Sequence, residues 1–422
     1  MIKIINNASP ADMTFTRKPF DTAREAVVRG IIEDVRARGD EALIQLCAKF
    51  DGAVLTDLCV SEKEIDEAYA RVDKKFIAIL SEAKENIEAF HKKQLREGFE
   101  IKKPDGSILG QRFTAIEKIG VYVPGGTAAY PSSVLMNVIP ALVAGAKDIT
   151  LCTPTKGGVI KDEILAAAKL CSVTRIIKCG GAQAIAAMAY GTASVPKADK
   201  IVGPGNIYVA LAKKAVYGDV GIDMIAGPSE ILIIADKTAN PNYVACDLLS
   251  QAEHDELATA ALITDSPAFA KEVQGEIEKA MAKLSRRDIA RKSIDDNGVI
   301  FVVKDLDEAA AFSDEIAPEH LELYVEKPLD MLKKIRNAGS VFLGGYSPEP
   351  LGDYFAGPNH TLPTGGSARF SSPLSVDDFM KKSSYIYYTE KAILDCADKV
   401  AEFAAREGLD AHAMSILSRK NK

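Results

Sequence analysis

The sequence predicts an α/β fold with two domains built on parallel sheets, a helical N-terminal region and a helical C-terminal tail. Short apolar segments alternate with segments of helical spacing, first over residues 132–216 and again over residues 231–343. Such alternation is typical of a parallel sheet with helices on both faces. Turns rich in glycine follow several of the apolar segments, as expected where a strand leads directly into a helix.

Length and composition indicate a soluble globular protein of two or three domains. The chain has 422 residues, of which 47% are hydrophobic and 26% are charged, and these values are ordinary for such proteins. Its net charge is -7 and its basic residues are scattered along the chain. Nucleic acids and anionic membranes bind basic surfaces, so we expect neither of them as a partner.

The sequence also predicts a cytoplasmic location. Residues 1–20 lack the apolar core of a secretory signal. The longest apolar stretch, Val134 to Ala146, is interrupted by Asn137 and Pro140 and is too short to span a bilayer. The seven cysteines are odd in number and form no C-x-x-C pair, which favours reduced thiols packed in the core.

The N-terminal region, to about residue 95, is predicted to be helical. Asp21 to Arg38 and Phe76 to Phe90 carry apolar residues at helical spacing, and Ser61 with Glu64 forms a capping box before a helix between them. A hairpin follows, because two β-type segments flank Asp105-Gly106. Its strands are expected at Phe99–Ile101 and Ile108–Phe113.

The first β/α series places glycine turns directly after strands. Helix N-termini with glycine can bind phosphate through backbone N–H groups, but glycine also suits any tight turn. No strict G-x-G-x-x-G or Walker motif occurs. The common position of the turns at the carboxyl ends of one sheet favours a nucleotide crevice. The strands are Ile119–Val123, Ile149–Cys152, Arg175–Cys179 and Lys200–Val202, and the turns are Pro124-Gly125-Gly126, Gly180-Gly181-Ala182-Gln183 and Gly203-Pro204-Gly205-Asn206.

The second β/α series leads into a long loop and a tail. Residues 344–373 are rich in Gly, Pro and Ser, and a loop of this length suggests a function. From Val376 onward the tail is predicted to be mainly helical. The strands of the series are expected at Ile231–Ile234, Ala260–Thr264, Val299–Val303 and Ser340–Leu343, and its helices at Tyr243–His254, Ala268–Leu284 and Leu306–Glu315.

Four residues form a candidate metal site. Gln251 and His254 are three residues apart in a predicted helix, so both side chains project from one face. Asp353 and His412 offer a carboxylate and a second imidazole, and nitrogen and oxygen ligands without thiolate suit zinc in an open catalytic site. Spacing alone leaves the alternative that the helical histidine is a surface or packed residue.

The adjacent residues Glu319 and His320 form a candidate acid/base pair. Histidine is the side chain whose pKa lies nearest neutral pH, which suits a general base. Spacing alone also allows a simple charge pair at a helix end. Cys179 is the best placed thiol, but no base near it in the sequence equips it as a nucleophile, so we do not expect covalent thiol catalysis.

Taken together, these segments resemble the histidinol dehydrogenase family over nearly the whole chain. Several unusual strings in one order are far more specific than any single motif. They are Gly120-Val121-Tyr122-Val123-Pro124-Gly125-Gly126, Gly203-Pro204-Gly205-Asn206, Asp223-Met224-Ile225-Ala226-Gly227-Pro228-Ser229-Glu230, Gln251-Ala252-Glu253-His254, Pro318-Glu319-His320, Gly352-Asp353-Tyr354, Pro358-Asn359-His360-Thr361-Leu362-Pro363-Thr364-Gly365-Gly366, Phe370-Ser371-Ser372-Pro373-Leu374-Ser375-Val376 and Glu407-Gly408-Leu409-Asp410-Ala411-His412.

The resemblance implies a role for each candidate residue. His320 corresponds to the catalytic base and Glu319 to the carboxylate that activates water. His412 would come from the C-terminal tail of a partner subunit, which implies a homodimer with exchanged tails and shared sites. The implied ligands of one Zn²⁺ per subunit are Gln251, His254, Asp353 and His412. The implied substrate contacts are these four with Ser229, Glu319, His320, Tyr354, His360 and Glu407, and the implied NAD contacts are Tyr122, Gln183 and Asn206.

The resemblance also implies the reaction and the domains. The family oxidises L-histidinol to L-histidine through L-histidinaldehyde with two NAD⁺, the last step of histidine biosynthesis. We therefore expect two Rossmann-like domains. Residues 1–121 would pack with residues 230–365 as the catalytic α/β domain, residues 122–229 would bind NAD, and residues 366–422 would form the dimerisation tail.

Two other interpretations remain open at this point. One is a related dehydrogenase that acts on another polyol or a sulfonated alcohol, and the other is a zinc- or nucleotide-binding regulatory protein. His360 and Glu407 favour histidinol, because they suit its imidazole and amine. The intact Glu319-His320 pair favours catalysis over regulation. Manganese or cobalt could also occupy a site of nitrogen and oxygen ligands.

Overall fold

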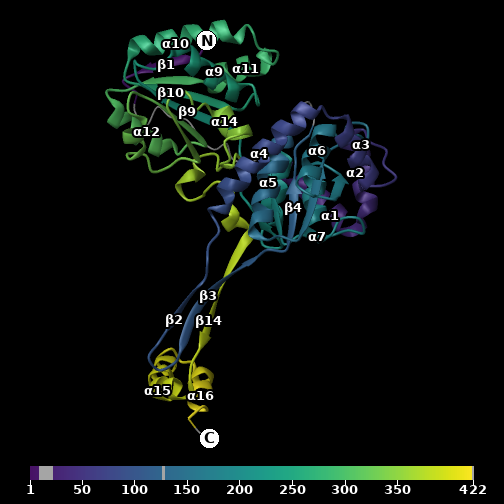
Figure 1. Ribbon diagram of the computed structural model, residues 1–422, viewed down its shortest axis with the longest axis vertical. Helices are drawn as coiled ribbons and strands as arrows, with labels where there is room; N and C mark the ends of the chain where they lie inside the picture. Colours follow the sequence, from purple (N-terminus) through teal and green to yellow (C-terminus); the bar gives the residue numbers. More distant parts are fainter. Residues whose placement is uncertain (9–21, 126–128, 421–422) are drawn as a thin grey trace. The chain divides into compact units, whose positions relative to one another are not determined.

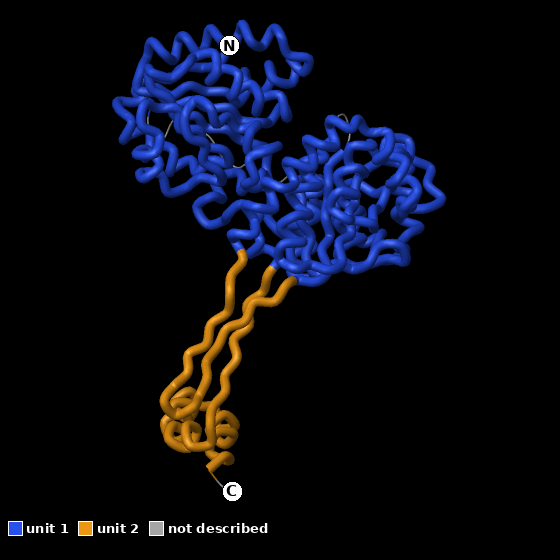
Figure 2. Tube along the Cα trace, in the orientation of Figure 1, with its two compact units in different colours: residues 1–94, 116–379 blue, residues 95–115, 380–422 orange. Residues whose placement is uncertain are grey.

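The computed structural model describes residues 1–8, 22–125 and 129–420. The described chain is an α/β protein that divides into two compact units, residues 1–94 with 116–379 and residues 95–115 with 380–422 (Figure 2). Two predictions concern residues outside the described ranges. They are the absence of a signal over residues 1–20, most of which are not described, and the glycine turn at position 126. Within the described ranges, no helix combines the length and the apolar character needed to cross a membrane.

The first sheet of the larger unit is the predicted first β/α series. All five strands are parallel, in the order β6-β5-β4-β7-β8. The chain leaves β4 toward one edge and later returns to the other side of β4, so the order reverses between β4 and β7. Parallel sheets bind ligands at the carboxyl ends of the strands where this reversal occurs. The strands are β4 (Lys118–Tyr122), β5 (Asp148–Thr153), β6 (Arg175–Lys178), β7 (Lys200–Val202) and β8 (Gly221–Ile222), and the helices are α5 (Pro131–Ala144), α6 (Asp162–Leu170), α7 (Gly181–Tyr190) and α8 (Ile207–Val216).

The second sheet repeats this topology with one added strand. Its order is β1-β11-β10-β9-β12-β13, again all parallel, and here the reversal falls between β9 and β12. The sequence did not reveal that the two halves share a strand order. The strands are β1 (Lys3–Asn6), β9 (Glu230–Ala235), β10 (Thr259–Thr264), β11 (Val299–Val302), β12 (His320–Tyr324) and β13 (Ser340–Leu343).

Helices cover both faces of the second sheet and bury its apolar side chains. One core joins β9 and β10 to helices α9 (Pro241–Ala252), α10 (Pro267–Met281) and α11 (Arg287–Asn297). The other core joins the opposite face to α12 (Leu306–Ile316) and α13 (Pro328–Leu332). Residues that pair across parallel strands share a face, and His320 pairs with Ile231, whose side chain lies in the α9 core. His320 therefore faces α9, as does Glu322 two residues later.

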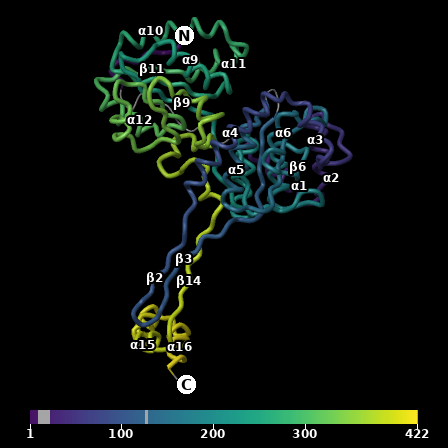
Figure 3. Tube along the Cα trace, viewed as in Figure 1, coloured from purple at the N-terminus to yellow at the C-terminus, as the bar shows by residue number. Residues whose placement is uncertain are grey.

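The N-terminal helices pack on the helices of the first β/α series. Helix α1 packs on α7 and α8, α3 packs on α6, and α4 lies beside α5 (Figures 1 and 3). The predicted capping box is confirmed, because the Ser61 hydroxyl accepts from the Glu64 amide and the Glu64 carboxylate accepts from the Ser61 amide. Strand β1 joins the second sheet, whereas these helices contact helices of the first β/α series. The N-terminal helices are α1 (Thr22–Arg38), α2 (Asp40–Asp51), α3 (Glu62–Arg71) and α4 (Lys74–Lys92).

The smaller unit is a three-stranded antiparallel sheet followed by two helices. The predicted hairpin is confirmed as β2 (Phe99–Lys102) and β3 (Ile108–Ala115). The tail from Val376 is mainly helical, as expected, but it also contains a strand that was not predicted, β14 (Met380–Tyr387), which pairs with β3 along its whole length. The physical reason is that β3 offers a free edge to a segment rich in β-forming residues, Tyr385-Ile386-Tyr387. Helices α15 (Glu390–Arg406) and α16 (Asp410–Leu417) complete the unit.

Candidate functional site

The C-terminal end of α9 presents the first two candidate ligands. Gln251 lies in its last turn with 1% of its surface exposed, and its Oε1 is buried without a hydrogen-bond partner among the described residues. His254 follows directly, with Nδ1 2.9 Å from the carbonyl oxygen of Ser250. A carbonyl can only accept, so Nδ1 carries the proton and Nε2 keeps a lone pair for a ligand.

The start of β12 presents a neutral histidine with an unused lone pair. His320 is buried, and its Nδ1 lies 2.9 Å from the carbonyl oxygen of Glu230, to which it donates. Its Nε2 has no hydrogen-bond partner among the described residues and lies 3.9 Å from Oδ1 of Asp353. Burial lowers the pKa of His320 below its ordinary value. The ring can therefore accept a proton on Nε2, as a general base must.

Glu319 lies beside this histidine and is fixed by the same neighbour. Its Oε2 accepts a hydrogen bond of 2.8 Å from the Glu230 amide and lies 3.6 Å from Nδ1 of His320. Burial raises the pKa of Glu319 well above the ordinary value. Burial also raises the pKa of Glu230 to about 7, although its Oε1 accepts from the amide of Gly365 at 2.9 Å. The residues just before β12 and at the start of β9 are thus joined by hydrogen bonds.

A strained residue turns the chain toward this pair. Ala317 ends α12 in the left-handed region, with φ of 52°, and it is fully buried. A residue other than glycine in this region costs on the order of 1 kcal/mol or more, and such residues gather at functional sites. Pro318 follows at once, and the next two residues are Glu319 and His320.

Helix α14 (Glu349–Tyr354) adds a second carboxylate to the site. Ligand atoms of His320, Glu349 and Asp353 all lie within 4.8 Å of one another. Burial and, after it, the nearby negative charge of Glu349 raise the pKa of Asp353 well above its ordinary value. The sequence analysis missed Glu349, which is 1% exposed and accepts from the Ser250 hydroxyl at 3.1 Å. Its position four residues before Asp353 was the available signal, because that spacing places both on one helix face.

Three further candidates lie in the same unit. Burial is the largest cause of the lowered pKa of His360, which is about 4. Ser229 directly precedes β9, and its carbonyl accepts from the amide of Thr259 at 3.0 Å. Tyr354 ends α14 and is 58% exposed.

The candidates for nucleotide contact surround the carboxyl ends of β4 and β7. Tyr122 ends β4, and its hydroxyl accepts from the amide of Gly181 at the start of α7. Gln183 is buried in the first turn of α7. Asn206 follows β7 and caps α8, since its Oδ1 accepts from the amides of Tyr208 and Val209. The capping leaves the Nδ2 hydrogens of Asn206 as donors.

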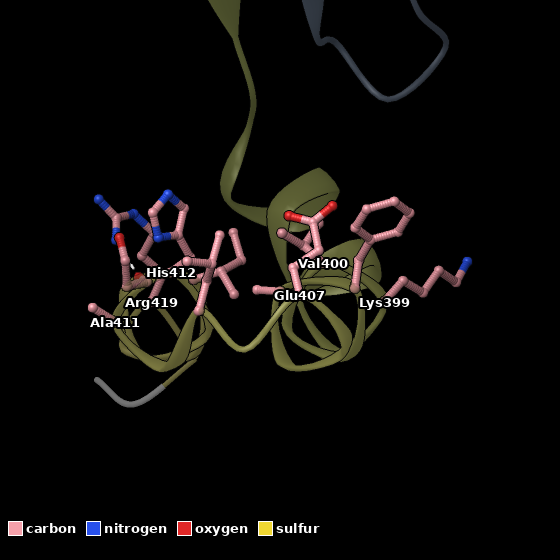
Figure 4. Close-up of a pocket in the computed structure, with 11 residues that line it drawn as sticks. Lys399, Val400, Glu407, Ala411, His412 and Arg419 are labelled. Carbon is pink, nitrogen blue, oxygen red and sulfur yellow. Dashed lines mark hydrogen bonds between the residues drawn. The ribbon is translucent and has the colours of Figure 1, made fainter.

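The last two candidates belong to the smaller unit. Glu407 ends α15 and His412 lies in the first turn of α16, and both line one pocket formed by these helices. Figure 4 shows the Glu407 carboxylate and the His412 ring projecting to the same side of the two helices. The candidate ligands are thus divided between the units, with Gln251, His254 and Asp353 in the larger one.

Comparison with known proteins finds close relatives over the full chain. A family model described as histidinol dehydrogenase matches residues 16–420. The chain is 57% identical to the histidinol dehydrogenase of Bacillus thuringiensis over 392 residues, which cover 93% of this chain and 91% of the relative. It is 51% identical to the histidinol dehydrogenase of Bacillus subtilis, with 99% of each chain covered. The crystal structure of histidinol dehydrogenase from Elizabethkingia anophelis matches with a TM-score of 0.94 and 41% identity, covering 99% of this chain and 98% of that one.

A buried histidine outside the candidate set gives a prediction for stability against pH. His91 on α4 is fully buried between Gln94, whose Oε1 lies 2.7 Å from Nδ1, and Asn359, whose Nδ2 lies 3.5 Å from Nε2. It thereby anchors the loop that carries His360. Burial lowers the pKa of His91, so below about pH 6.5 the unfolded state binds more protons than the folded state.

We therefore expect the free energy of unfolding to fall with decreasing pH below about 6.5, with a contribution from His91 of at most about 1.4 kcal/mol per pH unit. The variant His91→Gln should lose this part of the slope. Urea unfolding of both proteins at pH 8 and pH 5, followed by circular dichroism, measures it, and the pH 8 pair is the control. Equal slopes in the two proteins would contradict the assignment.

Proposed function

The chain belongs to the histidinol dehydrogenase family of NAD-dependent oxidoreductases, and on this premise we propose that it oxidises L-histidinol to L-histidine with two NAD⁺. The observation that carries the proposal is the state of His320. Its ring is neutral, and its Nδ1 is fixed by the Glu230 carbonyl. Its Nε2 has no hydrogen-bond partner among the described residues and lies 3.9 Å from the half-buried carboxyl of Asp353.

We propose that Gln251, His254 and Asp353 hold one zinc ion per subunit, together with His412 from a second copy of the chain. The donor set fits such an ion, because the buried Oε1 of Gln251 has no hydrogen-bond partner among the described residues and Nε2 of His254 keeps a lone pair. Two carboxyl groups, the buried Glu349 and the half-buried Asp353, also lie together, and a bound cation would offset their mutual repulsion. Bound zinc supplies Lewis acidity and a chelation point for the imidazole and amine of the substrate.

In the first oxidation, Nε2 of His320 accepts the proton of the substrate hydroxyl. The imidazolium that forms is favoured by the carbonyl of Glu230 at Nδ1 and by the nearby carboxyl of Glu319. NAD⁺, when bound, accepts the hydride that leaves the carbinol carbon. The product of this step is L-histidinaldehyde.

In the second oxidation, Glu319 activates the water that attacks the aldehyde. Burial raises its pKa, which makes its carboxylate a stronger base than an exposed one, and the Glu230 amide holds Oε2 in place. The second hydride of the hydrated aldehyde goes to a second NAD⁺, and His320, which has released its first proton to solvent, takes the hydroxyl proton. Four electrons leave as two hydrides, and no thioester is needed, which agrees with the burial of the Cys179 thiol.

We assign the remaining contacts by chemistry. Ser229, Tyr354 and His360, with Glu407 of a second copy, suit the imidazole and amine of L-histidinol. Tyr122, Gln183 and Asn206 suit NAD, because they surround the strand ends at which parallel sheets bind ligands. We assign residues 122–229 to NAD binding, 230–365 with the N-terminal region to chemistry, and 366–422 to dimerisation.

A homodimer with exchanged tails is part of the proposal. The tail helices expose large apolar side chains, among them Val400, Phe403 and Met414, which is typical of an interface. The seven free cysteines are compatible with a reducing compartment, and we propose a cytoplasmic location.

The proposed stoichiometry is directly measurable. We expect two NADH per L-histidinol consumed by zinc-loaded protein, and little NADH after chelator treatment, with activity restored by zinc. Absorbance at the NADH band with a known amount of substrate measures the ratio. One NADH per substrate would indicate that the aldehyde is released, and none would contradict the proposed function.

The variant His320→Asn tests the base. We expect kcat to fall by about 10²-fold or more, because general-base catalysis contributes on that order. Zinc content by atomic absorption should stay unchanged, since His320 is outside the proposed ligand set. Full activity of His320→Asn would rule out the role.

Complementation tests the exchanged tails. His254→Ala and His412→Ala homodimers should each bind zinc weakly and turn over slowly. Heterodimers made by refolding a mixture should regain activity, because one of the two sites then has all four ligands. The controls are mixtures of each variant with itself. Verified heterodimers without any gain would count against tail exchange.

A further inference from the structure

We propose that the buried pair Lys213–Asp223 helps to position NAD. The pair holds the amide and carbonyl of Gly203 and thereby fixes the loop that carries Asn206. We call these three residues the Gly203 clamp. The inference rests on the proposed function, because it assigns a role to residues next to the proposed NAD contacts.

One ion pair satisfies both polar groups of Gly203. Lys213 Nζ contacts Oδ1 of Asp223 and donates to the Gly203 carbonyl at 3.0 Å. Asp223 Oδ2 accepts from the Gly203 amide at 2.8 Å. The side chains of Lys213 and Asp223 are 3% and 0% exposed. Charged hydrogen bonds in such dry surroundings are stronger than those at the surface.

Glycine at position 203 explains why a polar clamp is needed. Its φ is +116°, and a Cβ there would lie 2.0 Å from the carbonyl oxygen of Tyr122. No side chain fits at this place, so packing of residue 203 cannot hold the loop. The close approach also means that a shift of Gly203 moves the loop against the end of β4, where Tyr122 lies.

The clamp joins three successive parts of the chain. Gly203 follows β7, Lys213 belongs to the helix that Asn206 caps, and Asp223 follows β8. Asp223 Oδ1 also accepts from the amide of Met224, which fixes the start of the segment that leads from β8 to Ser229. The orientation of Asn206 thus depends on both ends of α8, through its own cap and through Lys213.

A buried ion pair is a weak source of stability, which points to a positioning role. Replacing such a pair by apolar residues of similar volume is often neutral for folding, whereas removing one partner leaves an unpaired buried charge. The double variant Lys213→Met/Asp223→Leu leaves no unpaired buried charge, although the Gly203 amide and carbonyl lose their partners. It should fold and bind zinc but hold the loop less well.

The test is binding of NADH alone, measured by fluorescence titration. We expect the double variant to raise the Kd for NADH by about tenfold, the order of one lost contact, and to raise the KM for NAD⁺ more than it changes kcat. The KM for L-histidinol should stay close to the wild-type value, whereas the melting temperature should fall, because the Gly203 amide and carbonyl lose their partners. The matched control is Arg175→Met/Asp148→Asn, which removes an ion pair at the amino ends of β5 and β6 of the same sheet.

The outcomes separate the clamp from the proposed function. Equal NADH affinities of wild type and double variant overturn the clamp alone. Lack of NADH binding by the wild type overturns both. Should the double variant not fold, Asp223→Asn takes its place, because it keeps an acceptor for the Gly203 amide but removes the charge that holds Lys213. It should weaken NADH binding by about threefold or more, and an unchanged Kd overturns the clamp.

Discussion

The backbone of Glu230 is the constraint on which the candidate site depends. Its carbonyl accepts from Nδ1 of His320 and its amide donates to Oε2 of Glu319, so one residue fixes the tautomer of the histidine and the orientation of the carboxylate. This is possible only because β9 and β12 are neighbours in the sheet and parallel in register, with Ile231 opposite His320. A shift of one residue would turn His320 away from α9 and toward the opposite core.

The two sheets share a strand order, but their candidate residues lie at opposite ends of the strands. In the first sheet the nucleotide candidates follow strands, as expected for a parallel sheet. In the second sheet Glu319 and His320 stand at the start of β12, and Ser229 stands directly before β9. The end of α9 leads into β10, so Gln251 and His254 also lie near the amino ends of the strands. The same strand order thus places candidate residues at the carboxyl ends of the strands in one sheet and at their amino ends in the other.

Much of the fold could be predicted from local patterns. The capping box at Ser61, the hairpin around Asp105-Gly106 and the alternation of strands and helices all depend on residues close in sequence. Strand β14 was missed because its partner β3 is far away in the chain, and residues 116–379 lie between them. β-Pairing of this kind depends on a distant edge and not on a local signal.

The candidate site was predictable to a smaller degree. Local motifs indicated Glu319-His320 and the Gln251/His254 pair. Glu230, Glu349 and His91 were not singled out, because each acts through a contact with a distant element. Glu230 acts through its backbone, which leaves no trace in residue type, and His91 acts by holding the loop at Asn359. Strand order and register, not composition, decide which residues meet.

The smaller unit has a consequence for the order of synthesis. It consists of residues 95–115 and 380–422, so its hairpin emerges from the ribosome long before the strand that completes its sheet. Until β14 arrives, the edge of β3 is unpaired, and the exposed Phe99 and Ile101 lie on the neighbouring strand β2. Unpaired apolar edges are where nascent chains associate wrongly. Chains that stop before residue 380 would keep this edge open, which makes an intact 3′ end of the message a condition for safe folding.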